Sequence, residues 1–154
     1  GINTILEEWD NNTDMFNINW LAYMLATVKH ETANTFQPIK EYGKGKGRKY
    51  GKIINGHIYY GRGFVQLTWD FNYIKLGKIL NIDLYNNPDL ALDLKNATNI
   101  MFIGMRDGLS TGKKLNDYMN DSITNFYQSR KIINGLDKAS LIESYAKKFL
   151  NCIK

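Results

Sequence analysis

The chain has 154 residues, of which 44% are hydrophobic and 23% are charged. These values are ordinary for one globular domain with its own core, and no apolar run approaches the ~20 residues of a membrane span. The formal net charge of +5 favours an anionic partner such as nucleic acid, a membrane surface or bacterial cell wall. A lysine-rich surface that is merely solvated explains the same charge, so composition leaves the partner open.

The N-terminus and the cysteine content bear on the cellular compartment. The first ten residues lack a basic stretch followed by an apolar stretch, so no signal peptide is predicted. Gly1 is not a start residue, so the natural chain can begin earlier. The single cysteine, Cys152, excludes an internal disulfide and fits synthesis in a reducing compartment.

The first predicted helix covers Trp20 to Thr32, because apolar residues recur there at intervals of three and four. Asn17 or Asn19 is expected to cap its start. After a loop rich in glycine and lysine (41–52), Ile53 to Tyr60 should form a β-hairpin. The Asn-Gly pair at its centre supplies the positive φ angles that a type I′ turn needs.

The rest of the chain is predicted to be helical. The expected segments are Phe71–Leu80, Asn87–Asp107 with a break near Asp93, Asp121–Ile133, and a last helix capped by Asp137 with Leu136 and Leu141 as a hydrophobic staple. Pro88 suits a helix start and Gly108 a helix end. The sequence therefore predicts a mainly α fold with one small β-hairpin, built as a single domain over residues 1–154.

Glu31 is the first candidate for chemistry. Its spacing from Met24 and Val28 places it on the apolar stripe of its helix, in the last turn, where the helix dipole is negative. Both effects disfavour the ionised carboxylate, and a carboxyl that keeps its proton near neutral pH can act as a general acid. A glutamate that turns to solvent at a frayed helix end fits the same position equally well.

Glu41 is the second candidate, in the loop that follows. Four cationic side chains come soon after it, which should keep its carboxylate ionised: Lys44, Lys46, Arg48 and Lys49. Two carboxyls in contrasting environments are the acid and the base of glycoside hydrolysis. Most loop glutamates are simply solvated, so Glu41 alone is a weak signal.

The segment from Tyr60 to Trp69 carries the most specific pattern. Gly61 and Gly63 flank Arg62 and allow a sharp turn with close backbone approach. The polar side chains that follow, Gln66, Thr68 and Asn72, offer neutral hydrogen bonds that suit hydroxyl and acetamido groups. A β-turn packed under aromatic rings is the structural alternative.

Two other kinds of site fit poorly. A zinc hydrolase would need a second histidine where Asn34 stands, and two histidines with one cysteine make a poor ligand set. A phosphate-binding loop would need an apolar strand before Gly43–Arg48, and Gly112-Lys113-Lys114 lacks the upstream glycine and the following Ser or Thr. No metal and no organic cofactor is therefore expected.

These motifs resemble those of family 19 glycoside hydrolases, the plant-type chitinases and the related phage endolysins. The resemblance rests on His30-Glu31-Thr32, Tyr59 to Thr68, Asn72-Tyr73 and Ile133-Asn134-Gly135, and covers roughly Leu21 to Ile153. The short spacing from Glu31 to Glu41 and the lack of disulfides resemble the phage branch. The resemblance implies a lysozyme-like helical fold and an inverting mechanism.

The resemblance also assigns roles to single residues. Glu31 matches the general acid, Glu41 more loosely the general base, and Thr68 the hydroxyl that helps to hold the attacking water. The expected substrate-binding residues are Tyr60, Arg62, Gln66, Asn72, Arg130 and Asn134.

The departures from the family concern the substrate. Leu136, Ala33 and Asn34 stand where the family often has glycine, and the loops that lengthen the cleft of plant chitinases are missing. Peptidoglycan, a polymer of related amino sugars, is therefore the expected substrate, with chitin oligomers as the alternative. A non-catalytic module that binds cell wall through its basic and aromatic surface would not need Glu31.

The expectation for the whole molecule is a monomeric endolysin-type, muramidase-like glycosidase. It should bind peptidoglycan glycan strands, without nucleic acid and without stable membrane insertion. In the host it should remain in the cytoplasm until lysis and then reach the cell wall.

Overall fold

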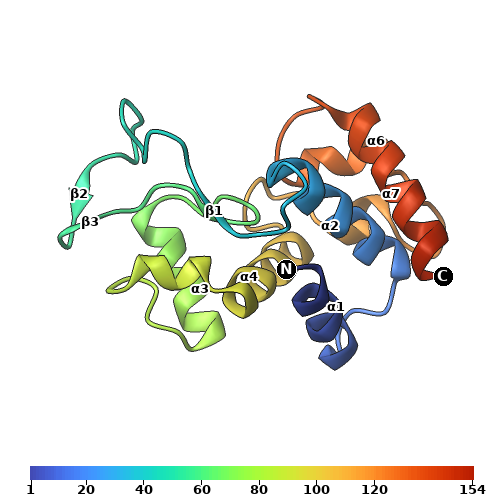
Figure 1. Cartoon of the computed structure of the whole chain (residues 1–154), viewed down its shortest axis with the longest axis horizontal. Helices are drawn as coiled ribbons and strands as arrows, with labels where there is room; N and C mark the ends of the chain where they lie inside the picture. The colour runs from blue at the N-terminus through green and yellow to red at the C-terminus, as the bar shows by residue number, and fades with distance from the viewer.

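Seven α-helices and two short 3₁₀ helices carry most of the chain (Figure 1). The computed structural model describes all residues from Gly1 to Lys154. The α-helices are α1 (Ile2–Asn11), α2 (Ile18–Glu31), α3 (Asp70–Leu80), α4 (Leu94–Asp107), α5 (Leu115–Tyr118), α6 (Phe126–Ser129) and α7 (Ala139–Ile153), and the 3₁₀ helices are η1 (Pro88–Leu92) and η2 (Arg130–Ile132). The predicted helical fold is confirmed. None of these helices combines the length and the apolar character of a membrane span.

The strands are short and form two separate antiparallel pairs. The predicted hairpin is present as β2 (Ile53–Ile54) and β3 (His57–Ile58), joined by Asn55 and Gly56 at φ angles of 52° and 73°. The second pair was not predicted. It joins β1 (Ile39–Lys40) to β4 (Arg62–Gly63), more than twenty positions later in the chain.

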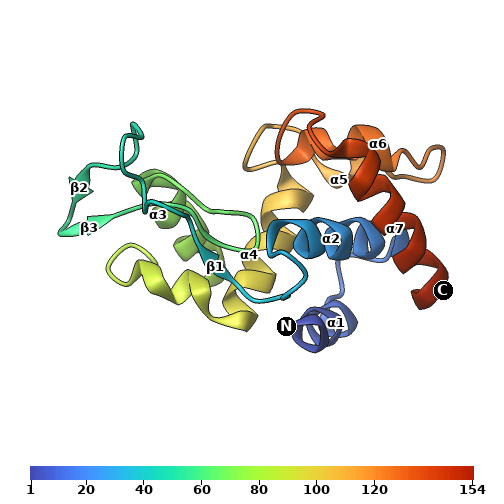
Figure 2. The ribbon, with the colours of Figure 1, turned by 45° about the horizontal axis from the view of Figure 1, so that its top comes forward.

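Helix α2 is the centre of the larger core. Asn17 caps it by accepting a 3.0 Å hydrogen bond from the Asn19 backbone N–H. Every residue from Leu21 to Val28 is buried, so the helix is enclosed on all sides. Helix α7 packs alongside α2, and α1 packs against α4 (Figures 1 and 2).

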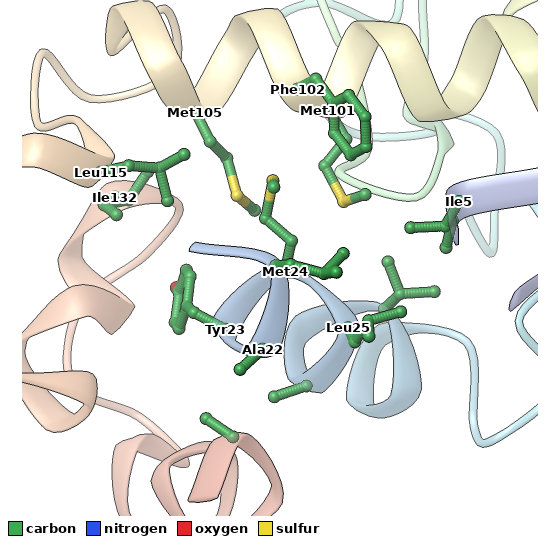
Figure 3. Packing of buried hydrophobic residues seen from close by; sticks show 14 of the residues in the cluster. Ile5, Ala22, Tyr23, Met24, Leu25, Met101, Phe102, Met105, Leu115 and Ile132 are labelled. Atoms are coloured by element: carbon green, nitrogen blue, oxygen red, sulfur yellow. The ribbon is translucent and has the colours of Figure 1, made fainter. Parts of the chain in front are cut away.

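The buried apolar side chains form two clusters. The larger one gathers residues of α1, α2, α4 and the C-terminal helices; Figure 3 shows Met24 of α2 facing Met101 and Met105 of α4. The smaller one contains Tyr59, Tyr73, Leu76, Leu84, Ala91 and Ile100. Helix α4 contributes to both, because Ile100 faces one cluster and Met101 the other.

Two helix starts differ from the prediction. The segment from Asp121 to Asn125 is not helical, because the Asn120 side chain accepts hydrogen bonds from the N–H groups of Ser122 and Ile123 and holds a turn there. Helix α6 begins only after Asn125, which caps it through the Gln128 N–H. Asp137 does not cap α7, whose N-cap residue is Lys138 at φ 62° with no side-chain hydrogen bond.

Candidate active site

Glu31 is the last residue of α2 and is paired with a buried cation. Its Oε1 accepts a 3.0 Å hydrogen bond from Nη1 of Arg130. The Arg130 side chain is 3% exposed and that of Glu31 is 26% exposed, so the carboxylate stands at the surface above a buried guanidinium. The apolar stripe predicted an apolar setting for Glu31, whereas its carboxylate is partly exposed and paired with a cation that comes from a distant segment.

Arg130 also orders the segment that carries Asn134. Its Nε donates to the backbone carbonyl of Asp137 at 3.0 Å, and its own carbonyl accepts from the Asn134 N–H at 3.0 Å. The Asn134 side chain is exposed, and its Oδ1 accepts from the Gly135 N–H at 2.8 Å. Its Nδ2 makes no hydrogen bond within the chain and can donate to a ligand.

Glu41 follows β1 and is fixed at both its backbone and its carboxylate. Its N–H donates to the Gly61 carbonyl at 2.7 Å, which joins it to the glycine-rich turn. One carboxylate oxygen accepts from the Gly45 N–H at 2.6 Å and the other from the Tyr50 hydroxyl. Glu41 therefore lies folded back into its own loop.

Tyr50 was not singled out from the sequence, because nothing in the spacing connects it to Glu41. Burial, followed by the hydrogen bond to Glu41, raises the pKa of its hydroxyl above the ordinary value. Its ring packs edge-on against Trp69, with centroids 5.8 Å apart. Tyr50 thus links the Glu41 loop to the residue after Thr68.

The glycine-rich turn is built around Gln66, which has a φ of 54°. Its Nε2 donates to the carbonyls of Ile39 and Gly63, both at 3.1 Å. A side chain at Gly61 would place its Cβ 2.6 Å from the Gln66 Oε1, so any larger residue there would displace the Gln66 amide. The turn thereby brings Gln66 beside the strand that leads to Glu41.

Arg62 and Tyr60 lie beneath this turn. The Arg62 guanidinium is 5% exposed, donates to Asp89 at 2.8 Å and lies 3.7 Å from the centre of the Tyr60 ring. It also donates to the hydroxyl of Tyr73 at 3.0 Å. Arg62, expected to bind substrate, is therefore engaged in holding the turn, and Tyr60 is 7% exposed under it.

A hollow of about 250 Å³ brings other predicted residues together. Gln66, Thr68 and Asn72 line it, and Asn72 donates from Nδ2 to the Thr68 carbonyl at 3.1 Å. Ile133, next to Asn134, lines the same hollow from the side of the larger cluster, whereas Ile100 belongs to the smaller one. The hollow thus lies between the two hydrophobic clusters. Neither Glu31 nor Glu41 is among its lining residues.

No three His, Cys, Asp or Glu side chains come together in an arrangement that could hold a metal ion. The polar side chains around the hollow are neutral, and the two candidate carboxyls, Glu31 and Glu41, stand on segments that precede all of its lining residues in the sequence. Hydroxyl and amide groups of this kind can bind uncharged polar ligands through hydrogen bonds.

Comparison with known proteins agrees with this geometry. The family model of class I chitinases, glycoside hydrolase family 19, matches residues 21–102. An inactive chitinase-like protein of Hevea brasiliensis is 57% identical over 36 residues, which are 23% of this chain and 12% of that protein. The sequence thus aligns with only a small part of this plant relative.

Solved structures extend the similarity to most of the chain. Chitinase C from Streptomyces griseus HUT6037 is 27% identical, with a TM-score of 0.65 over 86% of this chain and 58% of that one. A bacterial family 19 chitinase has a TM-score of 0.71 over 97% of this chain and 82% of its own, and its 22% identity supports the fold alone. The family model covers more than half of the sequence, and the chain belongs to glycoside hydrolase family 19, the class I chitinases.

Proposed function

We propose that this protein is an inverting glycosidase that hydrolyses β-1,4 bonds between amino sugars of bacterial peptidoglycan. The observation that carries the proposal is the position of Glu31, which ends α2 within the family match and is held at the surface by Arg130. A carboxyl with a fixed orientation is what proton transfer to a leaving-group oxygen requires.

The proposed mechanism uses two carboxyls and one water. Glu31 acts as the acid and protonates the oxygen of the bond that breaks, while Glu41 acts as the base and takes a proton from the attacking water. Thr68, whose neighbour Trp69 packs against Tyr50 of the Glu41 loop, is proposed to orient this water. Attack from the side opposite the leaving group inverts the anomeric carbon.

Gln66, Asn72 and Asn134 are proposed to bind the sugar ring and its acetamido group. Gln66 and Asn72 line the hollow, and the free Asn134 amide stands next to Ile133 at its other side. Arg130 and Arg62 act by holding Glu31 and the turn in place. Tyr60 supports Arg62 from below. No cofactor is part of this mechanism.

Chitin oligomers are the second candidate substrate, because the family and the Streptomyces griseus relative are named for chitinase. The preference for peptidoglycan rests on the missing cleft-extending loops and on the net charge of +5, which suits an anionic wall. A binding module without activity is the third candidate. The Hevea brasiliensis protein, named inactive, shows that strong similarity over this segment does not by itself establish catalysis.

We further propose that residues 1–154 form one catalytic domain of the phage endolysin type that acts as a monomer. It would be held in the host cytoplasm and reach the wall at lysis. The two hydrophobic clusters share helix α4, which supports one domain over two.

The decisive experiment is mass spectrometry of digested substrates. Purified peptidoglycan and chitin hexamer are incubated separately with the protein, and the new reducing ends are identified. We expect muropeptides with a new reducing amino sugar, and faster cleavage of peptidoglycan than of chitin hexamer. Products from chitin alone would identify chitin, and not peptidoglycan, as the substrate. Binding without any product would support the third candidate, a binding module without activity.

A further inference from the structure

A second polar hollow lies at the far end of α2 from Glu31. It has a volume of about 720 Å³ and is formed by the loop before α2, the first turn of α2, and α5 with the turn that follows it. Helix α2 has 14 residues, so the hollow and Glu31 are separated by about 20 Å along the helix axis. The hollow is therefore distinct from the candidate active site.

The side chains of this hollow are of two kinds. The hydrophobic ones are both aromatic, Phe16 and Trp20, and Phe16 is 81% exposed. Four asparagines complete most of the wall: Asn17, Asn19, Asn116 and Asn120. An aromatic face beside several amides matches a sugar ring, which offers C–H groups on its face and hydroxyl or acetamido groups at its edge.

Three of the four asparagine side chains are already oriented by hydrogen bonds to the protein. Asn17 donates from Nδ2 to the Met119 carbonyl at 3.3 Å, and Asn120 donates to the Asn116 carbonyl at 2.9 Å. The indole N–H of Trp20 donates to the Met119 carbonyl at 2.7 Å. The side chain of Asn116 makes no hydrogen bond within the chain and is exposed, so its amide is free for a ligand. Little side-chain entropy remains to be lost at the fixed positions on binding.

The charges in the hollow select among ligands. Its lining contains Asp14 and Asp121 and no lysine or arginine, although the whole chain carries a net charge of +5; Asp14 is paired with Arg106 at 3.6 Å from outside the lining. The lining therefore offers no cation to bind a phosphate group, and the carboxylate of Asp121 repels one, which disfavours nucleic acid and anionic lipid. With only two hydrophobic lining residues, the hollow also lacks the apolar wall that an amphipathic helix of a protein partner would need.

We propose that this hollow is a second glycan-binding site, which takes a β-1,4-linked chain of N-acetylated amino sugars by stacking one ring on Phe16. The choice of this glycan rests on the proposed function, because the polymer that is cut is the one available for a second contact. Two contacts with one polymer raise the effective concentration of the active site on an insoluble substrate.

The experiment is an NMR titration of isotopically labelled protein carrying Glu31→Gln, so that the ligand is not consumed. The ligands are chitin tetramer and, separately, a tetrasaccharide of alternating N-acetylglucosamine and N-acetylmuramic acid whose lactyl carboxyls are capped as amides, because free carboxylates would be repelled by the acidic lining. We expect shifts of backbone amides at Asn17, Asn116 and Ser122 that fit one dissociation constant, separate from shifts at Thr68 and Asn72. Whichever tetrasaccharide gives the smaller constant at the hollow identifies the natural source.

Phe16→Ala in the same background should weaken binding at the hollow by about tenfold, the size of one good aromatic contact, and leave the shifts at Thr68 and Asn72 unchanged. Ile53→Ala is the matched control, because Ile53 is 73% exposed and lies on the distant β2–β3 hairpin. Absence of shifts at the hollow with both ligands, or shifts that persist in Phe16→Ala, would overturn the proposal. Failure of the proposed function can be told apart from failure of this proposal. It would leave the polymer unaltered in the digestion experiment, whether or not a glycan binds at the hollow.

Discussion

Arg130 and Glu31 form a 3.0 Å ion pair although they are separated by 99 positions in the sequence. The pair joins the end of α2 to η2, and the guanidinium is the buried partner. Its geometry makes the candidate acid depend on a residue outside the segment that the family model matches.

Replacing the candidate acid tests the mechanism most directly. Glu31→Gln keeps the shape and the hydrogen-bond acceptor for Arg130 but removes the transferable proton. We expect hydrolysis of peptidoglycan to fall by about 10²–10⁴-fold with the circular dichroism spectrum unchanged. Glu143→Gln is the control, because Glu143 lies on α7 in a surface pair with Lys147. A folded Glu31→Gln protein with more than a tenth of the wild-type rate would remove Glu31 from the role of acid.

Breaking the ion pair from the other side should affect stability as well as activity. Arg130→Met leaves the Glu31 carboxylate and the Asp137 carbonyl without their buried donor. We expect the free energy of unfolding in urea to drop by about 3 kcal/mol, the lower end for a broken buried pair, because Glu31 keeps contact with water. Lys131→Met, at the exposed neighbour, should change it little. Equal stabilities for the two variants would mean that the pair contributes nothing to the fold.

The stereochemistry of the product tests the role of Glu41. If Glu41 is a base that acts through water, the first product carries the inverted anomer. We expect Glu41→Ala to lose turnover and to regain part of it with azide, which attacks without a base. Proton NMR on a short oligomer, read before mutarotation, reports the anomer. A retained anomer would require a nucleophile and would contradict the inverting mechanism.

The loop after Glu41 is expected to attract the wall through its charge. Lys44, Lys46, Arg48 and Lys49 are all exposed. Attraction between surface charges is screened over about 8–10 Å at moderate salt, so binding to purified cell wall should weaken between low and high salt. Changing all four residues to Gln should flatten this dependence in a pull-down assay. A salt profile identical to that of the wild type would exclude the loop from wall binding.

The buried hydroxyl of Tyr23 should make the free energy of unfolding fall at alkaline pH. Its hydroxyl is buried without a hydrogen-bond partner, and burial raises its pKa from 10.0 to about 12. The folded state holds this proton more tightly than the unfolded state, so the associated stability is present below pH 10 and is lost as the pH rises towards 12. Tyr23→Phe removes the unsatisfied group and should raise the free energy of unfolding by about 1 kcal/mol at neutral pH, with a larger gain above pH 10. Urea unfolding at both pH values measures this, and a less stable variant at both would show that the hydroxyl has a partner.

The local patterns explain why much of the helical fold was predictable. The enclosed apolar run gave α2 to within two residues at its start, and the Asp93 and Gly108 boundaries of α4 are as expected, with Gly108 at φ 71°. Helix α1 was missed, although Ile2, Ile5, Leu6 and Trp9 repeat at helical intervals and face the core. Helical spacing alone predicted a helix from Asp121, which was wrong because the Asn120 side chain holds a turn there.

The site was less predictable, because its contacts join distant segments. The sequence could propose Glu31 and the glycine-rich turn from local patterns. The spacing of residue types does not predict the pairing of β1 with β4, which ties Glu41 to Gly61. It also does not predict the hydrogen bond between the Tyr50 hydroxyl and the Glu41 carboxylate. Arg62 was expected to bind substrate, and the local sequence does not reveal its ion pair with Asp89, which lies 27 positions away.

Helix α4 has a consequence for how the molecule can move. Ile100 and Met101 are consecutive residues, yet they are buried in different hydrophobic clusters. A rotation of α4 that loosened one cluster would displace side chains in the other at the same time. The hollow lined by Thr68 and Ile133 therefore cannot widen by simple separation of two independent halves. Its width depends on the side chains that this one helix presents to the two clusters.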